Sequence, residues 1–317
     1  MTTFLTPRQQ ADRTSDAVEA AVAAGRGLDL TVTEPAVLHD LFSVVVHLAP
    51  SPVVARIPTV LPRPDDLAAI ARRQQDELDV TRWLADHNTP VIAPSPLVPR
   101  EPVQRDGFSM TFWPYVEEAR DKEPDYVANA ESVADLHAAL RAYPGRRLEF
   151  LSAADPQFIA DSLAVLDRHP ELIGAAELDR ARREWQLLEP LVRSRSAFET
   201  RFPRADLQPI HGDSPPANVF NAVDGGLFAD FELVTLGPVE WDLAGLGPEH
   251  EAAYNRGARH NGTRPLDDEV LAFVNALVML RVIATLTLVP QLPELMRYLK
   301  PTVDHWQTTP FTADLST

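Results

Sequence analysis

The spacing of hydrophobic residues predicts a small antiparallel sheet near the start of the chain. Residues 42–48 and 52–57 are runs rich in β-branched side chains, and the proline-containing break between them predicts a hairpin. Residues 108–116 form another apolar run, which predicts a further strand. Before the hairpin, residues 11–25 predict a surface helix that ends at a glycine.

A proline-marked link follows the hairpin and leads to a longer helix, which we expect to begin at Asp65 or Asp66 and to end near Asp86. One face of this helix carries residues at helical spacing, namely Leu67, Ile70, Ala71, Leu78, Thr81, Leu84 and Ala85. Glu77 falls on the same inward face, and a buried carboxylate needs a partner. The preceding strand offers Arg56, so we expect an ion pair between strand and helix.

The remainder of the chain is predicted to be mostly helical. A charged and polar stretch, residues 117–129, marks a junction, and helical periodicity then appears at residues 133–140, 160–166, 175–188 and 267–288. The apolar run at residues 270–289 contains Asn275 and Arg281. Because a charge at the centre of a bilayer costs roughly 2.5–3.5 kcal/mol, we expect a buried helix there and no membrane span.

The segment His211-Gly212-Asp213-Ser214-Pro215-Pro216-Ala217-Asn218, followed by Asp230-Phe231-Glu232, has the order of parts found in a kinase catalytic loop. Asp213 is the predicted base for an acceptor hydroxyl. Asn218 and Asp230 are predicted ligands of Mg²⁺, which prefers oxygen donors that it shares with substrate phosphates. The alternative is an ordinary polar turn before an ordinary hairpin.

The residues between Asn218 and Asp230 predict how these two side chains meet. Residues 219–228 contain two apolar runs around Asp224-Gly225-Gly226, which indicates a hairpin. The two ends of a hairpin lie side by side, so Asn218 and Asp230 are expected to face one metal ion.

Residues 211–244, including Gly237-Pro238 and Trp241-Asp242-Leu243-Ala244, resemble the aminoglycoside phosphotransferase and choline kinase superfamily. The resemblance implies an α+β, two-lobed protein-kinase-like fold. Residues 1–114 are expected to form a small nucleotide-binding lobe with an antiparallel sheet and one key helix, and residues 115–317 a larger, mostly helical lobe. The same resemblance implies that His211 organises the catalytic loop and that Asp242 supports it.

The resemblance also implies a nucleotide site in the small lobe. Arg56 and Glu77 match the strand cation and helix glutamate that position the phosphates, although lysine is usual where this chain has Arg56. Residues 38–43, directly before Val44, contain no glycine, so Ser43 or a nearby backbone amide is expected to cap the phosphates. Trp113 and Tyr115 match the hinge beside the adenine ring.

Composition adds limits to this interpretation. The 317 residues include 46 acidic and 29 basic side chains, for a net charge of −17, which argues against a nucleic-acid partner. The acidic surface suits a cationic acceptor, but it also suits simple solubility. The chain has no cysteine, and its first 29 residues lack the apolar core of a signal peptide, so we expect a cytoplasmic protein.

The larger lobe offers weaker candidates for acceptor binding. Residues 257–264 predict a loop where the superfamily's acceptors often bind. Glu240, Glu249, Glu251 and Tyr254 are candidates to meet a cationic acceptor, with a solvated surface as the alternative. His137 is expected to be a core histidine.

Several functions compete. A protein kinase is disfavoured because the few residues from Asp230 to Trp241 leave no room for a long activation loop. A metal-dependent hydrolase would need a histidine-rich ligand set, which the motif lacks. We expect a kinase that uses Mg²⁺ and ATP or GTP to phosphorylate a hydroxyl of an aminoglycoside-like antibiotic. The alternatives are a metabolic kinase of an amino alcohol, homoserine or sugar, and a nucleotide-binding protein without transfer activity.

Overall fold

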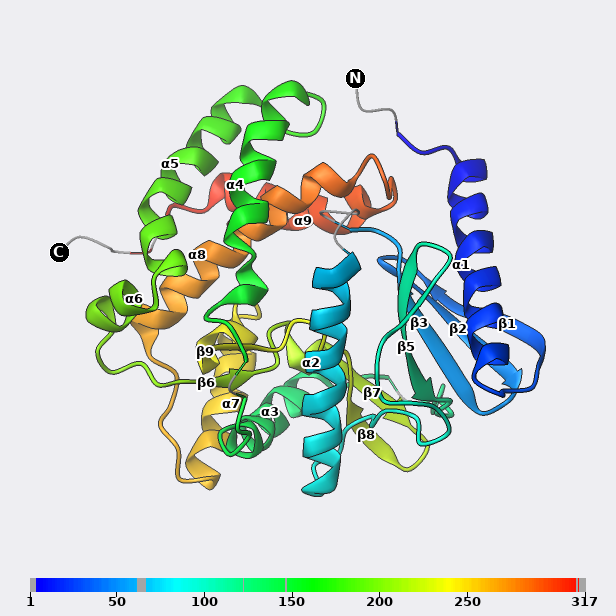
Figure 1. Cartoon of the computed structure of the whole chain (residues 1–317). Coiled ribbons are helices and arrows are strands. Elements are labelled where there is room, and N and C mark those ends of the chain that lie inside the picture. Colours follow the sequence, from blue (N-terminus) through cyan, green and yellow to red (C-terminus); the bar gives the residue numbers. More distant parts are fainter. Residues whose placement is uncertain (1–3, 62–66, 122, 146, 312, 314–317) are drawn as a thin grey trace.

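The chain folds into two parts that lie side by side, a sheet with two flanking helices and a larger helical part (Figure 1). The computed structural model describes residues 4–61, 67–121, 123–145, 147–311 and 313. The predicted α+β, two-lobed fold class is confirmed by this mixture of an antiparallel sheet and helices. The expected cap of the second helix, Asp65 or Asp66, lies outside the described residues.

The sheet of the N-terminal part has five antiparallel strands in the order β1-β2-β3-β5-β4. The predicted hairpin is present as β2 and β3, and the third predicted strand is β5. Two further strands of this sheet were not predicted, β1 and the short β4. Nearly all of β1 is exposed, so its side chains show no regular hydrophobic pattern. The strands are β1 (Val32–Asp40), β2 (Ser43–Pro50), β3 (Val53–Pro58), β4 (Val103–Arg105) and β5 (Phe108–Pro114).

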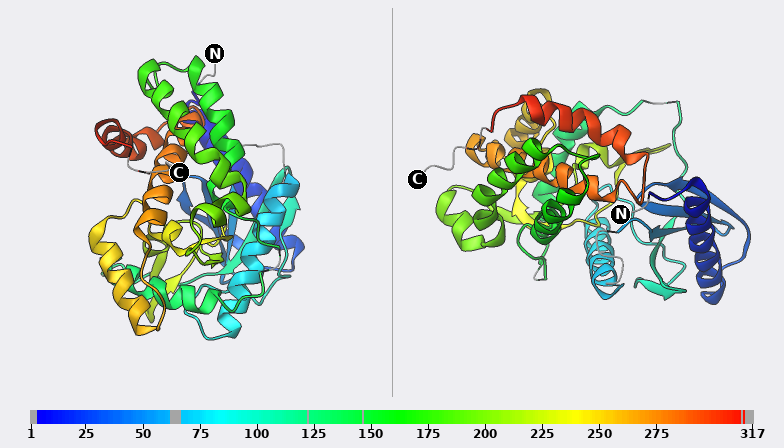
Figure 2. Two further views of the ribbon diagram at one scale, coloured as in Figure 1. Left: turned by 90° about the vertical axis from the view of Figure 1, so that its left-hand side faces the viewer. Right: turned by 90° about the horizontal axis from the view of Figure 1, so that it is seen from above.

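Two helices pack on opposite faces of this sheet, as Figures 1 and 2 show. Helix α1 (Pro7–Gly27) covers the outer face, where its buried alanines contact alternate residues of β2 such as Val44 and Val46. Helix α2 (Leu67–Asp86) lies on the inner face, and its Gln74 donates to the backbone oxygen of Ser109 on β5 at 3.1 Å. Further along α2, Val80 and Leu84 join the core of the helical part. Helix α2 therefore connects the sheet to the rest of the molecule.

The helical part contains two small two-stranded sheets, β6 with β9 and the β7–β8 hairpin. Its elements are α3 (Tyr126–Leu140), η1 (Ser152–Ala154), α4 (Pro156–Val165), η2 (Leu166–Arg168), α5 (Ala175–Arg193), α6 (Arg195–Arg201), β6 (Leu207–Ile210), η3 (Pro215–Ala217), β7 (Val219–Ala222), β8 (Gly225–Phe228), β9 (Thr235–Pro238), η4 (Val239–Leu243), α7 (Pro248–His260), α8 (Asp268–Thr285), η5 (Leu286–Leu288) and α9 (Leu295–Thr308).

Helix α8 together with η5 is long and apolar enough to cross a membrane by length and composition, with a mean hydropathy of 2.1. Half of its most apolar window is buried inside the protein. Phe273, Val274 and Leu277 of α8 belong to the same hydrophobic core as residues of α4, α5 and α9. A core helix, as predicted, accounts for this burial.

The expected loop at residues 257–264 was wrong in its first half, because α7 continues to His260. Gly257 is the first residue of the expected loop and lies inside the helix. In the structure, a Cβ at this position would lie 2.3 Å from the backbone oxygen of Glu131 on α3. Gly257 therefore serves close packing of α7 against α3, a requirement that local sequence does not reveal.

Candidate active site

The motif that contains Asp213 lies on the loop between β6 and the β7–β8 hairpin. Register pairs Val219 with Phe228, and the backbone N–H of Ala229 donates to the carbonyl of Asn218 at 2.9 Å. The hairpin therefore brings the backbone of Asn218 beside the residue that precedes Asp230, as predicted from its turn residues.

The backbone of this loop adopts conformations that few residues tolerate. Gly212 has φ +90°, and a Cβ there would lie 1.9 Å from the carbonyl oxygen of Leu233, so only glycine fits. Ser214 and Asp230 have φ of 39° and 64°, which is uncommon for residues with a Cβ. Such backbone conformations cluster at functional sites, where the surrounding structure holds them in place.

Asp242 fixes the loop from beneath. Its carboxylate is fully buried and accepts the backbone N–H groups of His211 at 2.9 Å and Gly212 at 2.8 Å. Trp241 adds a third contact, because its Nε1–H donates to the carbonyl of Gly212 at 2.8 Å. These bonds tie η4 to the loop that carries Asp213.

His211 uses both ring nitrogens within the loop. Nδ1 accepts the backbone N–H of Asp213 at 3.3 Å, so Nε2 carries the hydrogen that it donates to the carbonyl of Ala229 at 2.9 Å. The ring is buried against Phe231, with centroids 4.4 Å apart. With both nitrogens bonded to backbone atoms, His211 is placed to position Asp213 and not to exchange protons with a substrate.

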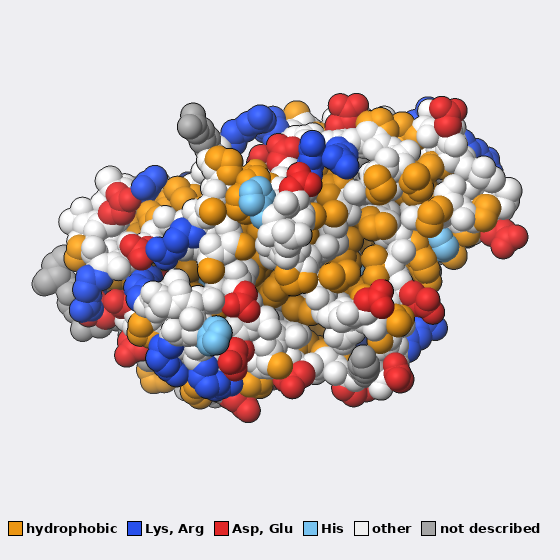
Figure 3. Space-filling model, turned by 90° about the horizontal axis from the view of Figure 1, so that it is seen from below, with side chains coloured by type: hydrophobic (Ala, Val, Ile, Leu, Met, Phe, Trp, Pro, Cys, Tyr) orange, Lys and Arg blue, Asp and Glu red, His pale blue; other side chains and the backbone are white. Residues whose placement is uncertain are grey.

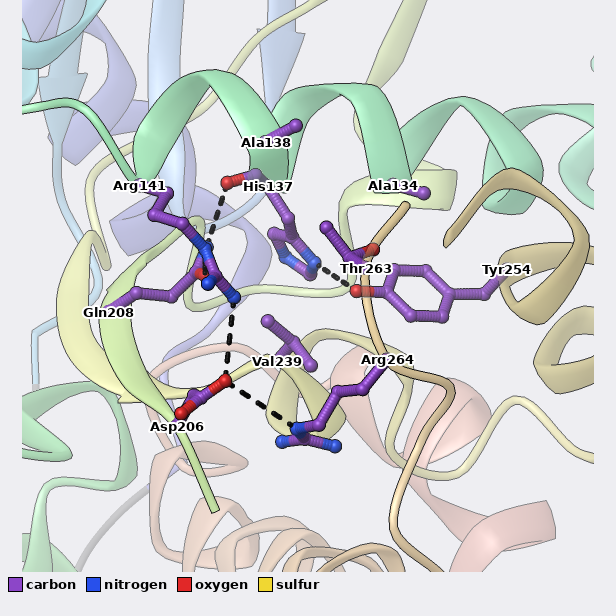
Figure 4. A pocket seen from close by; sticks show the side chains of 10 residues that line it. All are labelled: Ala134, His137, Ala138, Arg141, Asp206, Gln208, Val239, Tyr254, Thr263 and Arg264. Atoms are coloured by element: carbon purple, nitrogen blue, oxygen red, sulfur yellow. Dashed lines mark hydrogen bonds and ion pairs between the residues drawn. The ribbon is translucent and has the colours of Figure 1, made fainter. Parts of the chain in front are cut away.

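His137, which was expected to be a core histidine, is buried and belongs to the same hydrogen-bond network. Nε2 of His137 on α3 donates to Oδ2 of Asp242 at 2.8 Å, and its Nδ1 accepts the hydroxyl of Tyr254 at 3.0 Å. Figure 4 shows His137 and Tyr254 pointing toward one another, with Gln208 reaching the carbonyl of His137. Burial raises the pKa of Tyr254, so its hydroxyl remains protonated. Tyr254 is therefore a buried support and not an acceptor contact.

Arg56 joins the two parts of the molecule at the predicted nucleotide site. From β3 its guanidinium contacts Glu77 on α2 and Asp230 after β8, and its Nη1 lies 3.4 Å from Oε2 of Glu232. Burial by itself lowers the pKa of Arg56, but the three carboxylates outweigh it and raise that pKa above its ordinary value. The predicted pairing of Arg56 with Glu77 is therefore present, and Glu232 is an additional partner that the sequence did not indicate.

The carboxylates around Arg56 differ in exposure, because Glu77 is buried whereas the side chains of Asp230 and Glu232 are 41% and 35% exposed. Glu77 is 1% exposed, and burial raises its pKa to about 8 even with Arg56 beside it. Burial and the adjacent charge of Asp230 raise the pKa of Glu232 to about 7. One guanidinium fork thus serves carboxylates from two directions, a geometry that a single lysine ammonium does not match.

The other predicted nucleotide contacts lie along the inner side of the sheet. Ser43 starts β2, two residues before Val45, the cross-strand partner of Arg56, so it falls on the same face of the sheet as Arg56. Trp113 is buried, and its Nε1–H donates to Oγ1 of Thr111 at 2.9 Å. Tyr115 is accessible and stacks on His47 of β2, with ring centroids 4.1 Å apart.

Asp213 itself is accessible, with 40% of its side chain exposed. Nδ2 of Asn218 donates to the backbone oxygen of Asp213, which closes the loop between the predicted base and the predicted metal ligand. Burial and the charge of Asp230 raise the pKa of the Asp213 carboxyl, while Arg281 opposes this rise. Nη1 of Arg281 on α8 lies 3.9 Å from Oδ1 of Asp213.

A model of the phosphotransferase enzyme family matches residues 44–276, which include every element of this site except Ser43 and Arg281. The chain belongs to the phosphotransferase enzyme family. This membership confirms the predicted superfamily and the prediction of a phosphotransferase. No curated protein matches the chain in sequence.

Solved structures share the fold of this phosphotransferase at low sequence identity. A choline/ethanolamine kinase family protein from Mesorhizobium loti has a TM-score of 0.60 and 16% identity, covering 95% of this chain and 98% of its own. The GDP and kanamycin complex of APH(2")-IIia has a TM-score of 0.59 and 15% identity, covering 91% and 97%. The choline kinase LicA from Streptococcus pneumoniae has a TM-score of 0.58 and 13% identity, covering 90% and 99%.

Glu240 and Glu251, two acidic candidates for acceptor binding, differ in their exposure in this phosphotransferase. Glu240 was wrongly considered for an accessible site: it is fully buried, and Nη1 of Arg264 contacts its Oε1 at 2.6 Å. Glu251 lines a cavity of about 270 Å³ together with Asn275 and Met279 of α8, near the lower end of small-molecule sites.

Sequence reasoning missed Arg281 and His137 as parts of the site. Arg281 carries a signal that was visible in the sequence, because it is the lone charge of an apolar helix beyond its first turn. His137 carries none, since its partner Asp242 lies 105 residues away in the chain.

Proposed function

We propose that this phosphotransferase is a metal-dependent kinase that transfers the terminal phosphate of ATP or GTP to a hydroxyl group of a small molecule. The observation that carries the proposal is the convergence of Asp213, Asn218, Asp230 and the Arg56–Glu77 pair from separate elements. Each side chain has the chemistry that phosphoryl transfer requires at its place.

Asp213 is the proposed base. Its carboxylate accepts the proton of the acceptor hydroxyl while the hydroxyl oxygen bonds to the terminal phosphorus and the bond to the leaving nucleoside diphosphate breaks. The backbone bonds from Asp242 and His211 hold Asp213 in place for this step. Most of the catalytic effect of such a site comes from positioning and electrostatic stabilisation.

The donor set beside Asp213 fits a Mg²⁺ ion. Asn218 uses its Nδ2 toward Asp213, which leaves the amide oxygen as a ligand, and Arg56 contacts Oδ1 of Asp230, which leaves Oδ2. Among the described residues no three acidic or histidine side chains form a closed metal cage. Mg²⁺ suits a site with few protein ligands because it also binds phosphates, whose charge it neutralises when bound.

The nucleotide is proposed to lie between the sheet and the β7–β8 hairpin. The amide of Tyr115 donates to Pro52 on the β3 side at 3.0 Å. Because neighbouring residues of an extended chain point in opposite directions, the carbonyl of Pro114 and the amide of Val116 face away from β3, where a purine edge can bind them. Arg56, fixed by Glu77, is proposed to contact the phosphates, with Ser43 above them.

Two classes of small molecule are candidates for the acceptor. The sequence-based expectation is an aminoglycoside-like antibiotic, and kanamycin is present in the solved complex of APH(2")-IIia. The alternative is a metabolic acceptor such as an amino alcohol, homoserine or sugar. On the face seen in Figure 3, acidic and basic side chains are interspersed, and hydrophobic ones gather near its middle.

The test is release of ADP or GDP by the purified protein with Mg²⁺ and a panel of hydroxyl-bearing acceptors. Asp213→Asn is expected to lose turnover by orders of magnitude while it still binds nucleotide, because the backbone bonds of the loop remain. Asp86→Asn, at the exposed end of α2, is the matched control and should retain full activity. Acceptor-dependent release that survives in Asp213→Asn, or no release with any acceptor, would contradict the proposal.

A further inference from the structure

A single cation faces the proposed base from α8. Nη1 of Arg281 lies 3.9 Å from Oδ1 of Asp213, and the two side chains are 30% and 40% exposed. This distance is too long for a hydrogen bond, yet the opposite charges face one another. The guanidinium therefore lies beside the carboxylate without closing it off from a substrate.

The setting of Arg281 is unusual for an arginine of this protein. It follows Val278, Met279 and Leu280 in the most apolar helix of the chain. Among the described residues its guanidinium donates no hydrogen bond. By contrast, Arg180 and Arg264 reach carboxylates at 2.7 and 2.6 Å. The guanidinium is partly exposed beside Asp213, so its unbonded donors are accessible to a ligand at that position.

We propose that Arg281 binds an anionic group of the acceptor, so that the substrate is a hydroxyl compound with a carboxylate or phosphate a few bonds from the reacting oxygen. This inference rests on the proposed function of Asp213 as the base. A hydroxyl that Asp213 activates must lie about 2.6–3.2 Å from its carboxylate. Since Arg281 lies beside the same carboxylate oxygen, its planar fork reaches the atoms next to that hydroxyl and matches a carboxylate or phosphate.

The charges around the site explain why such an arginine is needed. Asp213, Asp230 and Glu232 all present carboxylates near the reacting position, and the whole chain has a net charge of −17. These carboxylates would repel an anionic acceptor unless a cation lies beside the anionic group of the bound acceptor. An ammonium group at the same place would be repelled by the positively charged guanidinium of Arg281. Arg281 therefore favours hydroxy acids, hydroxyl-bearing amino acids or phosphorylated alcohols over polycationic amines.

The experiment compares acceptors in matched pairs, with the full-length protein, Mg²⁺ and ATP. Glycerate and glycerol 3-phosphate are each paired with uncharged glycerol, which distinguishes a carboxylate from a phosphate, and kanamycin represents cationic acceptors. The anionic member of one pair is expected to be phosphorylated at least about tenfold more efficiently than its uncharged match. Preferred turnover of kanamycin or of an uncharged acceptor overturns the inference but leaves the proposed function standing. No turnover with any acceptor overturns both.

Variants then assign the preference to Arg281. Arg281→Gln is expected to raise KM for the anionic acceptor by about 10- to 100-fold, with little change in KM for ATP or in turnover of the uncharged match. Arg281→Lys keeps the charge without the fork and should recover part of the loss. Arg82→Gln on α2, an exposed arginine, is the control. An equal fall in kcat for all acceptors in both Arg281 variants would overturn the inference, because it would place Arg281 on the transferred phosphate or on Asp213 alone.

Discussion

The buried contact between His137 and Asp242 predicts that a residue outside the catalytic loop controls activity. His137→Leu keeps a side chain of similar bulk but removes both ring nitrogens. Asp242 then loses the donor at 2.8 Å, and the hydroxyl of Tyr254 loses its acceptor at 3.0 Å. Asp242 retains only its two backbone donors, those of His211 and Gly212.

The magnitude follows from these two bonds. A hydrogen bond to a charged group contributes about 1.5–3 kcal/mol. A buried hydroxyl left without a partner costs about 1–3 kcal/mol more, and Tyr254 is only 2% exposed. We therefore expect His137→Leu to lower the free energy of unfolding by about 2–5 kcal/mol, the sum of the two terms less partial relaxation. In a chain of this size 1 kcal/mol corresponds to roughly 2–4 °C in Tm.

The assay combines thermal unfolding with steady-state kinetics of acceptor phosphorylation. His137→Leu should lower Tm clearly and reduce kcat, since the catalytic loop that holds Asp213 is less firmly fixed. Tyr254→Phe should cost about 1 kcal/mol, and the double variant should cost less than the sum because one bond is shared. His137→Gln, whose amide can still donate to Asp242, is the control and should recover part of both losses. A Tm within 1 °C of wild type (roughly 0.5 kcal/mol), with unchanged kcat, would refute the reasoning.

Further predictions concern other charged groups. Arg264→Ala should destabilise the protein by about 3–5 kcal/mol in chemical unfolding, because it leaves the fully buried Glu240 without its cation; a loss below 1 kcal/mol would contradict this. Arg56→Lys should lower kcat/KM for ATP by about 10- to 100-fold in kinetic assays, since one ammonium replaces two forked contacts, one of them with Glu77; unchanged kinetics would argue against it. The kcat/KM profile should lose activity as pH falls through a pKa of Asp213 above the ordinary 3.8, because the base must be ionised; a midpoint at or below 3.8 would disagree.

Local sequence patterns predicted the structure correctly where the residues of one short segment determine its conformation. The β2–β3 hairpin follows from two β-branched runs around a proline-containing break, and the β7–β8 hairpin from glycines in its turn. Glu77 could be assigned to the inner face of α2 because helical spacing fixes which residues share a side. The same reasoning failed at Gly257, because this glycine is required by close packing against the neighbouring helix α3 and does not mark a loop.

The sequence by itself determined the family, the order of the catalytic parts and the pairing of Arg56 with Glu77. Each of these depends on residue type and on spacing within one or two adjoining elements. Only the tertiary structure decided that His137 holds Asp242, that Glu232 joins Arg56, and that Arg281 faces Asp213. The physical reason is that these contacts join residues far apart in the chain: 105 positions for His137 and Asp242, 176 for Arg56 and Glu232, and 68 for Arg281 and Asp213. Packing of whole helices sets such distances, and no local pattern encodes them.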